Sequence, residues 1–329
     1  MKNIGLIKIF LKRSGGNTYK EHVINSLANN FNIKNVNLEG TYFKNRYLKA
    51  IESFIKLIFL KDKKDLWIRD FYSTITLNKK KTKGKNLSLF FHIDFSGFPI
   101  FSRIPLYLLE KFFLYGKLKK TDVIVVISEY WKNYFIKKGY KNIYKIYCGF
   151  DLNNFNITDE EVLEFKKKYK LEGKPIIYLG NCQKPKGVVD SYSALKDFNV
   201  HFVTSGRQRV KIPVLNIDVD YREYLKLLKA STIVITMSKF KEGWCMTAHE
   251  AMLCKTPVIG SGMGGMEELL KGGGQIICID FKELKKKVEY LLNNSEEREK
   301  IGKMGYNYAK DFTLERFKKE WLDLINKIL

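Results

Sequence analysis

Residues 233–260 read IVITMSKFKEGWCMTAHEAMLCKTPVIG, and the order of apolar and helical segments in them predicts the fold class. An apolar run at Ile233–Thr236 precedes a loop, a helical pattern at Met246–Leu253 and a second apolar run at Pro257–Gly260. Apolar runs without alternation suit strands that are covered on both faces. A strand, a helix and another strand in this order predict a parallel sheet with a right-handed crossover.

The same alternation continues toward both ends of the chain. In the first half it predicts five strands and four helices, at Ile4–Leu11, Ile33–Leu38, Leu66–Arg69, Leu87–His92 and Val123–Ile127, and at Tyr19–Asn29, Arg46–Leu60, Ile104–Tyr115 and Glu129–Lys137. In the second half it adds strands at Pro175–Leu179, Val200–Thr204, Val214–Ile217 and Gln275–Cys278, and helices at Tyr221–Lys229, Phe281–Leu292, Ser295–Lys310 and Leu314–Ile328.

The pattern pauses at Cys148–Asp151, and a charged helix follows, opened by a Thr158 cap with Glu161 three residues on. A chain of 329 residues is also too long for one ordinary open α/β domain. We therefore predict two doubly wound α/β domains, residues 1–155 and 156–312. Ligands of such sheets collect beyond the carboxyl ends of the strands, so we expect the site in a central cleft shared by the domains.

Composition limits the function classes. Apolar residues make up 45% of the chain, which excludes global disorder. A net charge of +24 indicates attraction to nucleic acid, a membrane surface or phosphorylated ligands, although a lysine-rich genome or thermal adaptation accounts for it equally well. Five cysteines without a C-x-x-C pair argue against a disulfide framework and a structural zinc site. Together with the absence of a signal peptide or apolar span, they suggest a cytoplasmic protein.

Two carboxylates in residues 233–260 carry the strongest chemical signal. Glu242 lies in a glycine-containing loop, and Glu250 lies eight residues on, inside the following helix. The first N–H groups of that helix, near Trp244–Thr247, form an anion site suited to a pyrophosphate. Glu250 is then placed to accept hydrogen bonds from a ribose, and Glu242 to contact sugar hydroxyls or to oppose positive charge at an anomeric carbon.

The E-x7-E spacing, with Glu250-Ala251-Met252 and Thr256-Pro257-Val258-Ile259 after it, resembles the donor-site signature of family 4 glycosyltransferases. The resemblance implies a GT-B fold of two Rossmann-like domains whose carboxy-terminal helix, 313–329, crosses back onto the first domain. It implies retaining, metal-independent transfer of a hexosyl-type group from a nucleoside-diphosphate sugar, a substrate rather than a cofactor. The acceptor would be a glycan, a lipid-linked molecule or a small molecule, as in cell-envelope glycan synthesis.

On this resemblance, further donor-binding residues follow in two loops. The stretch Gly262-Met263-Gly264-Gly265 contacts the phosphates or the sugar, and Lys186 neutralises the leaving diphosphate. Asn181, after Gly180, replaces the arginine that the family usually carries, so Arg207, Arg209 or Lys184 is expected to substitute. The donor-binding set is Gly180, Asn181, Arg207, Gly243, Trp244, Met246, Thr247, Glu250, Gly264 and Gly265, with Glu242, Lys186 and His92 as the catalytic set.

The amino-terminal half carries weaker matches to the same family. Gly15 and Gly16, after Ser14, form the expected loop for phosphate and acceptor, and they do not fit a dinucleotide-binding G-x-G-x-x-G pattern. His92 ends a strand and resembles the family's cleft histidine. Asp94 is a candidate acceptor-side group.

Several alternatives stay open. A nucleotide-sugar epimerase or hydrolase, or a non-catalytic nucleotide-sugar-binding protein, fits the same motifs, whereas nothing beyond charge supports a nucleic-acid binder. Asp218 and Asp220 resemble a metal-binding D-x-D, but we read Asp220 as a helix cap and expect no metal site. His249 is expected to pack beside Glu250 rather than act as a base. The basic, apolar helices Arg46–Leu60 and Arg103–Lys119 could meet an anionic membrane, on its inner face; we favour crossover helices with solvated basic faces.

Overall fold

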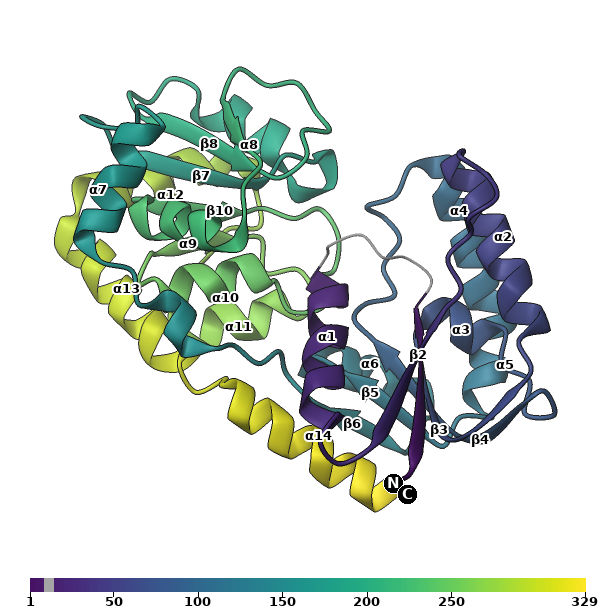
Figure 1. The fold of residues 1–329 in the computed structure, drawn as a ribbon. Coiled ribbons are helices and arrows are strands. Elements are labelled where there is room, and N and C mark those ends of the chain that lie inside the picture. Colours follow the sequence, from purple (N-terminus) through teal and green to yellow (C-terminus); the bar gives the residue numbers. More distant parts are fainter. Residues whose placement is uncertain (9–14) are drawn as a thin grey trace. The chain divides into compact units, whose positions relative to one another are not determined.

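A computed structural model describes residues 1–8 and 15–329 (Figure 1). Ser14 and the end of the predicted strand Ile4–Leu11 therefore lie outside the described residues. The chain divides into two compact units. Unit 1 consists of Met1–Phe95, Pro99–Gly149 and Leu314–Leu329, and unit 2 consists of Ser96–Phe98 and Phe150–Thr313.

Unit 1 is built on a parallel six-stranded sheet with the order β2-β1-β3-β4-β5-β6. Its strands are β1 (Asn3–Lys8), β2 (Asn32–Asn37), β3 (Asp62–Arg69), β4 (Thr82–Phe90), β5 (Val123–Val126) and β6 (Ile143–Lys145). Its helices are α1 (Gly15–Leu27), α2 (Arg46–Phe59), α3 (Phe71–Ile75), α4 (Ile100–Leu109), the π-helical turn η1 (Glu110–Leu114), α5 (Tyr115–Leu118), α6 (Glu129–Lys137) and α14 (Leu314–Ile328).

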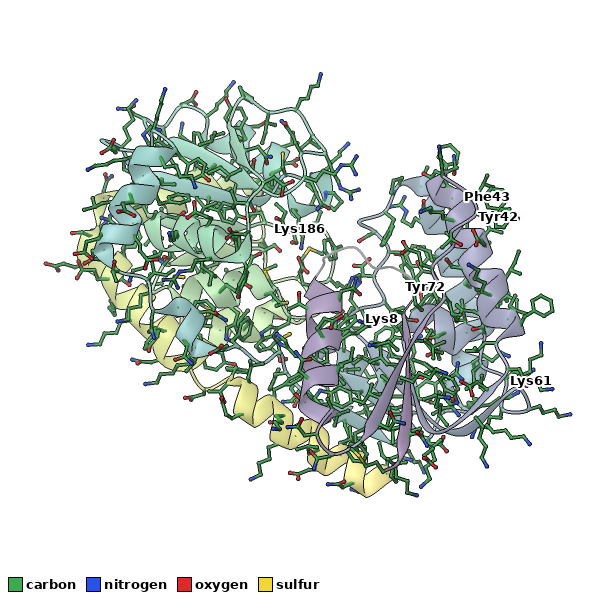
Figure 2. All side chains as sticks on the ribbon, in the orientation of Figure 1. Lys8, Tyr42, Phe43, Lys61, Tyr72 and Lys186 are labelled. Carbon is green, nitrogen blue, oxygen red and sulfur yellow. The ribbon has the colours of Figure 1, made fainter. Side chains whose placement is uncertain are left out.

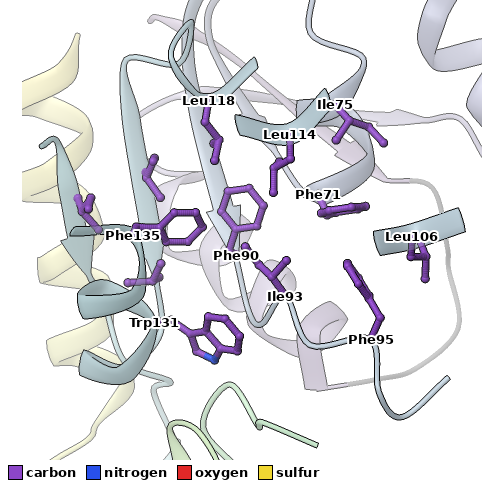
Figure 3. Close-up of a cluster of buried hydrophobic side chains, with 13 residues drawn as sticks. Phe71, Ile75, Phe90, Ile93, Phe95, Leu106, Leu114, Leu118, Trp131 and Phe135 are labelled. Carbon is purple, nitrogen blue, oxygen red and sulfur yellow. The ribbon is translucent and has the colours of Figure 1, made fainter. Parts of the chain in front are cut away.

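Two layers of helices cover this sheet. On one face, α1 packs against α14 through Tyr19, whose ring meets Phe317 and Trp321 edge to face at centroid distances of 5.0 and 6.3 Å. On the other face, Phe90 and Phe135 join a cluster of buried side chains from α3, α4, η1, α5 and α6 (Figure 3). Both faces of the central strands β1 and β5 are therefore buried, which is why these strands read as apolar runs, whereas the edge strand β2 is mostly exposed and polar.

Unit 2 repeats the architecture with the order β12-β11-β10-β7-β8-β9, again all parallel. Its strands are β7 (Ile176–Asn181), β8 (His201–Ser205), β9 (Leu215–Ile217), β10 (Ile233–Thr236), β11 (Val258–Gly260) and β12 (Ile276–Ile277). Its longer helices are α7 (Asp159–Lys168), α8 (Val188–Leu195), α9 (Tyr221–Ala230), α10 (Met246–Leu253), α11 (Met266–Gly272), α12 (Phe281–Asn293) and α13 (Ser295–Ala309).

The predicted strands and helices are present, with shifted ends, and three elements were missed. The Thr158–Glu161 capping box and the Asp220 cap are confirmed, because each side chain accepts a backbone N–H three residues on. No strong signal marks β6, which has three residues, or α3, which depends on a local cap between Asp70 and Ser73. α8 begins with two β-branched valines, which have low helix propensity.

A buried histidine holds α10 in place within unit 2. Trp244 Nε1 donates to His249 Nδ1 at 3.0 Å, and an indole can only donate, so the neutral imidazole carries its proton on Nε2. That nitrogen donates to the Ala309 carbonyl at 3.0 Å, and Phe150 stacks on the ring at 4.1 Å. His249 thus links α10 to the end of α13 and to the start of the unit, as the packing interpretation of His249 expected.

Acidification should weaken this link. Burial lowers the pKa of His249 from 6.5 to about 3, against a smaller opposing effect of the Ala309 carbonyl. Between these values the unfolded chain binds a proton that the folded chain does not, so stability falls as the pH drops from about 6.5 toward 3, by up to ~1.4 kcal/mol per pH unit. His249→Gln, which does not titrate, should show a shallower loss in urea denaturation between pH 7 and 5. Equal slopes for the two proteins would contradict this assignment.

Candidate functional site

The strand order of unit 2 reverses beside β7, which lies between β10 and β8. The connections that follow β7 and β10 leave in opposite directions, and this divergence opens a ligand crevice at the carboxyl ends of the two strands. Lys186 follows β7, and Glu242 follows β10. The two strongest predicted catalytic residues of this unit therefore come from the two strands that flank the reversal.

Lys186 and Glu242 form an ion pair. The Lys186 Nζ lies 2.6 Å from Glu242 Oε1, and the Ser238 hydroxyl donates to the same oxygen at 2.5 Å. The ammonium also lies 4.9 Å from the centroid of the Phe240 ring, a cation–π contact. The Lys186 side chain keeps 30% of its surface exposed while that of Glu242 keeps 9%. An ammonium has three donors, so Lys186 can hold Glu242 and still reach a ligand.

The charge state of Lys186 follows from two opposing effects. Burial disfavours its cation and by itself would lower the pKa of Lys186, but the nearby Glu242 carboxylate more than offsets this. The net effect is a raised pKa for Lys186. Lys186 is therefore a fixed positive charge at neutral pH, as neutralisation of a diphosphate requires.

Gly187 brings the two strand-end loops close together. Its φ is 74°, and a Cβ there would lie 2.1 Å from the Met237 carbonyl oxygen, so only glycine fits. The loop after β7 can thus approach the end of β10 and place Lys186 beside Ser238.

The predicted glycine loop is joined directly to the Glu242 backbone. Glu242 N donates to the Met263 carbonyl at 3.0 Å, and Gly265 N donates to the Glu242 carbonyl at 2.9 Å, which forms a short parallel bridge between Glu242 and Gly264. Gly264 has a φ of 73°, and a Cβ there would lie 2.5 Å from the Glu242 carbonyl oxygen. The positions of Glu242 and the Gly262–Gly265 loop are therefore set together.

Helix α10 begins next to this pair. Cys245 stands at its N-cap with a φ of 70° and a ψ of 72°, an uncommon conformation for a residue with a Cβ. Burial raises the pKa of the Cys245 thiol to about 12, with a further contribution from Glu242, so the thiol stays neutral. The Cys245 carbonyl accepts from Ala248 and His249, which leaves the N–H groups at Met246 and Thr247 as the orphan donors of a helix start.

Glu250 lies on the second turn of α10 and is 5% exposed. Tyr221 donates its hydroxyl to Glu250 Oε1 at 3.1 Å, and Tyr224 donates to the Thr247 hydroxyl at 3.2 Å. Burial and the Glu250 charge both raise the pKa of Tyr224. These two tyrosines were not among the predicted site residues, although both lie in the predicted helix Tyr221–Lys229.

Asn181 is held at the end of β7 by side chains of the neighbouring strand. Its Oδ1 accepts from Ser205 Oγ at 3.2 Å, and Ser205 Oγ lies 2.6 Å from the Tyr178 hydroxyl. The predicted substitutes for the missing arginine, Arg207 and Arg209, are exposed in the loop after β8. This loop is fastened by Asn216, whose amide donates to the Gly206 carbonyl at 2.9 Å.

Unit 1 has a cavity of its own, of about 310 Å3, at its own reversal of strand order. Here β1 lies between β2 and β3, and the lining comes from the segments after β1, β3 and β4. The lining residues are Gly16, Asn17, Lys20, Asp70, Phe71, Tyr72, Leu89, Phe90, Phe91 and His92. Of the residues predicted on the acceptor side, Gly16 and His92 line this cavity, while Gly15 at the start of α1 and Asp94 do not.

A lysine–carboxylate pair that was not predicted from the sequence lies in this cavity too. Lys20 Nζ lies 2.8 Å from Asp70 Oδ2, and the Asp70 carboxylate also accepts from the Ser73 backbone N–H and hydroxyl. Burial would raise the pKa of Asp70, but the charge and hydrogen bond of Lys20, together with the hydrogen bonds from Ser73, hold that pKa below its usual value. The available signal was the position of Asp70, directly after the predicted strand Leu66–Arg69.

Comparison with known proteins agrees with this geometry. Residues 159–308 match the family model described as glycosyl transferases group 1. An uncharacterized glycosyltransferase of Methanocaldococcus jannaschii is 25% identical over 62% of this chain, and the chain spans 59% of that relative's length. We call this matched segment, residues 159–308, the group 1 domain.

Two solved structures resemble the whole chain. Sucrose-phosphate synthase from Thermosynechococcus elongatus superposes with a TM-score of 0.83 at 16% identity, covering 99% of each chain. Anabaena HepE, in complex with UDP-glucose, superposes with a TM-score of 0.79 at 13% identity, covering 99% of this chain and all of HepE. These matches confirm the predicted GT-B fold of two Rossmann-like units.

The group 1 domain thus holds all the predicted donor-side residues. The structure brings Lys186, Glu242 and Gly264 into direct contact, and it places Glu250 and Thr247 on the helix that starts beside them. Trp244 is 1% exposed and its indole is committed to His249, so only its backbone is available to a ligand.

Gly264→Ala should separate Glu242 from the glycine loop of the group 1 domain. A Cβ at a positive φ, 2.5 Å from a backbone oxygen, forces the loop to move, at a cost of about 1–3 kcal/mol in unfolding free energy. Gly116→Ala is the matched control, because a Cβ at Gly116 meets nothing within 4 Å. Urea denaturation should show a loss for the first variant and none for the second; equal stabilities would show that the bridge to Glu242 is unimportant.

Proposed function

We propose that the protein is a retaining glycosyltransferase that moves a hexosyl-type group from a nucleoside-diphosphate sugar to a glycan, lipid-linked or small-molecule acceptor. The observation that carries the proposal is the Lys186–Glu242 pair, seated at the strand reversal of a group 1 domain and beside the start of α10. A fixed cation, helix N–H groups and a buried carboxylate are the groups that a diphosphate-activated sugar needs.

For the donor, the diphosphate is assigned to Lys186 and to the N–H groups at Met246 and Thr247. The ribose is assigned to Glu250, whose orientation Tyr221 fixes through its hydroxyl. HepE, which shares the fold, was solved with UDP-glucose, and this supports a nucleotide-sugar donor for the present chain.

In the transfer, the glycosidic bond to the diphosphate lengthens, negative charge grows on the phosphate oxygens and positive charge grows on the sugar. Lys186 and the helix N–H groups stabilise the first charge, and Glu242 stabilises the second. Because these groups are held in place by Ser238, Gly187 and the Gly264 bridge, they need little rearrangement during the reaction. In this proposal the lysine supplies the charge neutralisation, and no metal takes part.

For the acceptor, we assign the cavity of unit 1. Its aromatic walls at Phe71, Tyr72 and Phe91 suit the apolar face of a sugar or a hydrocarbon. Asp70, held ionised by Lys20, can accept a hydrogen bond from an acceptor hydroxyl, and His92 lines the same cavity.

Lys186→Ala should lower kcat by about a hundredfold or more, because the leaving diphosphate loses its fixed cation. Lys174→Ala removes an exposed lysine before β7 and serves as the control. Steady-state transfer of a labelled sugar measures both variants. Unchanged kinetics for Lys186→Ala would remove the leaving-group assignment, and a loss in Lys184→Ala instead would move it to that neighbour.

Glu250→Ala should raise the KM for the donor more than it lowers kcat, since a ribose contact is made equally in the ground state and the transition state. Tyr221→Phe should show the same pattern more weakly, because it removes only the hydroxyl that orients Glu250. An effect on kcat alone would instead assign Glu250 to the chemical step.

A thermal-shift screen across UDP-, GDP- and ADP-sugars tests the donor class, since a ligand that binds the folded state raises Tm. Product analysis with a labelled donor then separates the alternatives. Transfer to an acceptor supports the proposal, free sugar or an epimer indicates a hydrolase or epimerase, and binding without turnover indicates a non-catalytic protein.

A further inference from the structure

Helix α2 of unit 1 turns an apolar face outward. Six of its residues are large, apolar and 41% to 72% exposed: Tyr47, Leu48, Ile51, Ile55, Ile58 and Phe59. Their spacing of three to four residues places them on one side of the helix. A crossover helix normally presents polar residues to solvent. Because α2 exposes large apolar residues instead, the expectation of a solvated basic face for Arg46–Leu60 is wrong for this helix.

The polar side of α2 is used inside the protein. Glu52 accepts hydrogen bonds from the backbone N–H groups of Thr41 and Tyr42 and pairs with Lys56 at 2.7 Å. Lys56 in turn donates to the Glu39 carbonyl at 3.1 Å. These contacts lower the pKa of Glu52 to about 2, with Lys56 as the main cause, so the carboxylate stays ionised.

Two exposed aromatic residues, Tyr42 and Phe43, precede the start of α2, and we call them the aromatic tip. Glu52 holds the backbone N–H of Tyr42, whose side chain is 89% exposed, and Phe43, 45% exposed, is the next residue. Figure 2 shows these two rings at one end of α2 and Lys61 at the other. The outward face of α2 and this tip make one apolar strip with basic residues along it.

A second strip lies on the helical segment α4–η1. Its exposed apolar residues are Ile100, Phe101, Ile104, Tyr107, Leu108, Phe112 and Phe113, and Phe101 is 87% exposed. The buried Leu106 of α4 and the half-buried Phe54 of α2 pack against the same core cluster, so both helices cover the same face of the sheet. We call the two strips together, with Tyr42 and Phe43, the apolar face of unit 1.

The charges around the apolar face are almost all positive. Residues 42–61 contain five Lys or Arg and one acidic residue, and residues 99–120 contain the same numbers. Both acidic residues are engaged by the protein, Glu52 as described and Glu110 by the hydroxyls of Tyr115 and Tyr134. Lys81 also lies over the Phe59 ring at 5.1 Å. A single layer thus combines aliphatic side chains, aromatic rings and lysines.

We propose that the apolar face of unit 1 docks onto an anionic lipid bilayer. Aliphatic side chains would enter the headgroup–acyl boundary, aromatic rings would sit at the interface and the lysines would meet lipid phosphates. A second copy of the chain is a poorer occupant, because a symmetric dimer through this face would bring like charges together. In the part of the chain that the structure describes, none of the helices qualifies as a membrane span. The proposal does not depend on the transferase activity.

The test is co-sedimentation with vesicles of phosphatidylglycerol and phosphatidylcholine in equal amounts, and with vesicles of phosphatidylcholine alone. The wild-type chain should bind the anionic vesicles, bind the neutral ones at least about tenfold more weakly, and be partly released by high salt. The double variant Ile51→Glu, Ile55→Glu should bind anionic vesicles at least about tenfold more weakly.

The matched control is Leu163→Glu, Ile279→Glu, which places the same charges at exposed apolar positions of unit 2, and its binding should equal that of the wild type. Circular dichroism melting checks folding; if the first variant is unstable, Tyr42→Ser, Phe101→Ser takes its place, since both rings are almost fully exposed.

Three outcomes would overturn the proposal: equal binding of neutral and anionic vesicles, equal binding of the variants and the wild type, or a concentration-dependent dimer that the same substitutions disperse.

Discussion

The reversal of strand order beside β7 is the constraint on which the candidate donor site depends. Parallel strands end at one edge of the sheet, and their connections normally run on in one direction and cover that edge. Where the direction changes, two loops diverge and side chains from both can point at one ligand. Lys186 and Glu242 occupy these two loops, and Gly187 allows the loops to approach within a distance that any Cβ would prevent.

Unit 1 obeys the same constraint with different residues. Its strand order reverses at β1, which lies between β2 and β3. There too a lysine, Lys20, pairs with a carboxylate, Asp70. The surroundings differ: Lys186 keeps nearly a third of its side chain exposed and sits beside a helix start, whereas the cavity around Asp70 has aromatic walls. The first arrangement suits a polyanion, and the second suits a molecule with hydroxyl groups and an apolar surface.

In helix α2, the contacts of the charged side chains with a neighbouring loop also account for the exposure of the apolar side chains. Its charged residues are committed to the loop 39–42, and the helix can present its apolar side to solvent only because Glu52 and Lys56 find partners there. Such an arrangement is unfavourable for an isolated unit in water, since it leaves large aliphatic side chains exposed. It becomes favourable when a lipid bilayer covers that face.

Local signals in the sequence predicted most of the elements and the site motifs, but not β6, α3 and α8. Apolar runs predicted the parallel strands, and residue spacing predicted the Thr158 and Asp220 caps. The E-x7-E motif indicated the start of α10, with Glu250 on the helix and Glu242 in the loop before it. These signals are local, because they depend on helix and strand periods and on contacts a few residues apart. The contacts between distant side chains follow from the folded arrangement alone, as for Lys186 with Glu242 across 56 positions and Lys20 with Asp70 across 50. It also decided which side of α2 is buried, because that depends on the sheet beneath the helix and not on the helix's own period.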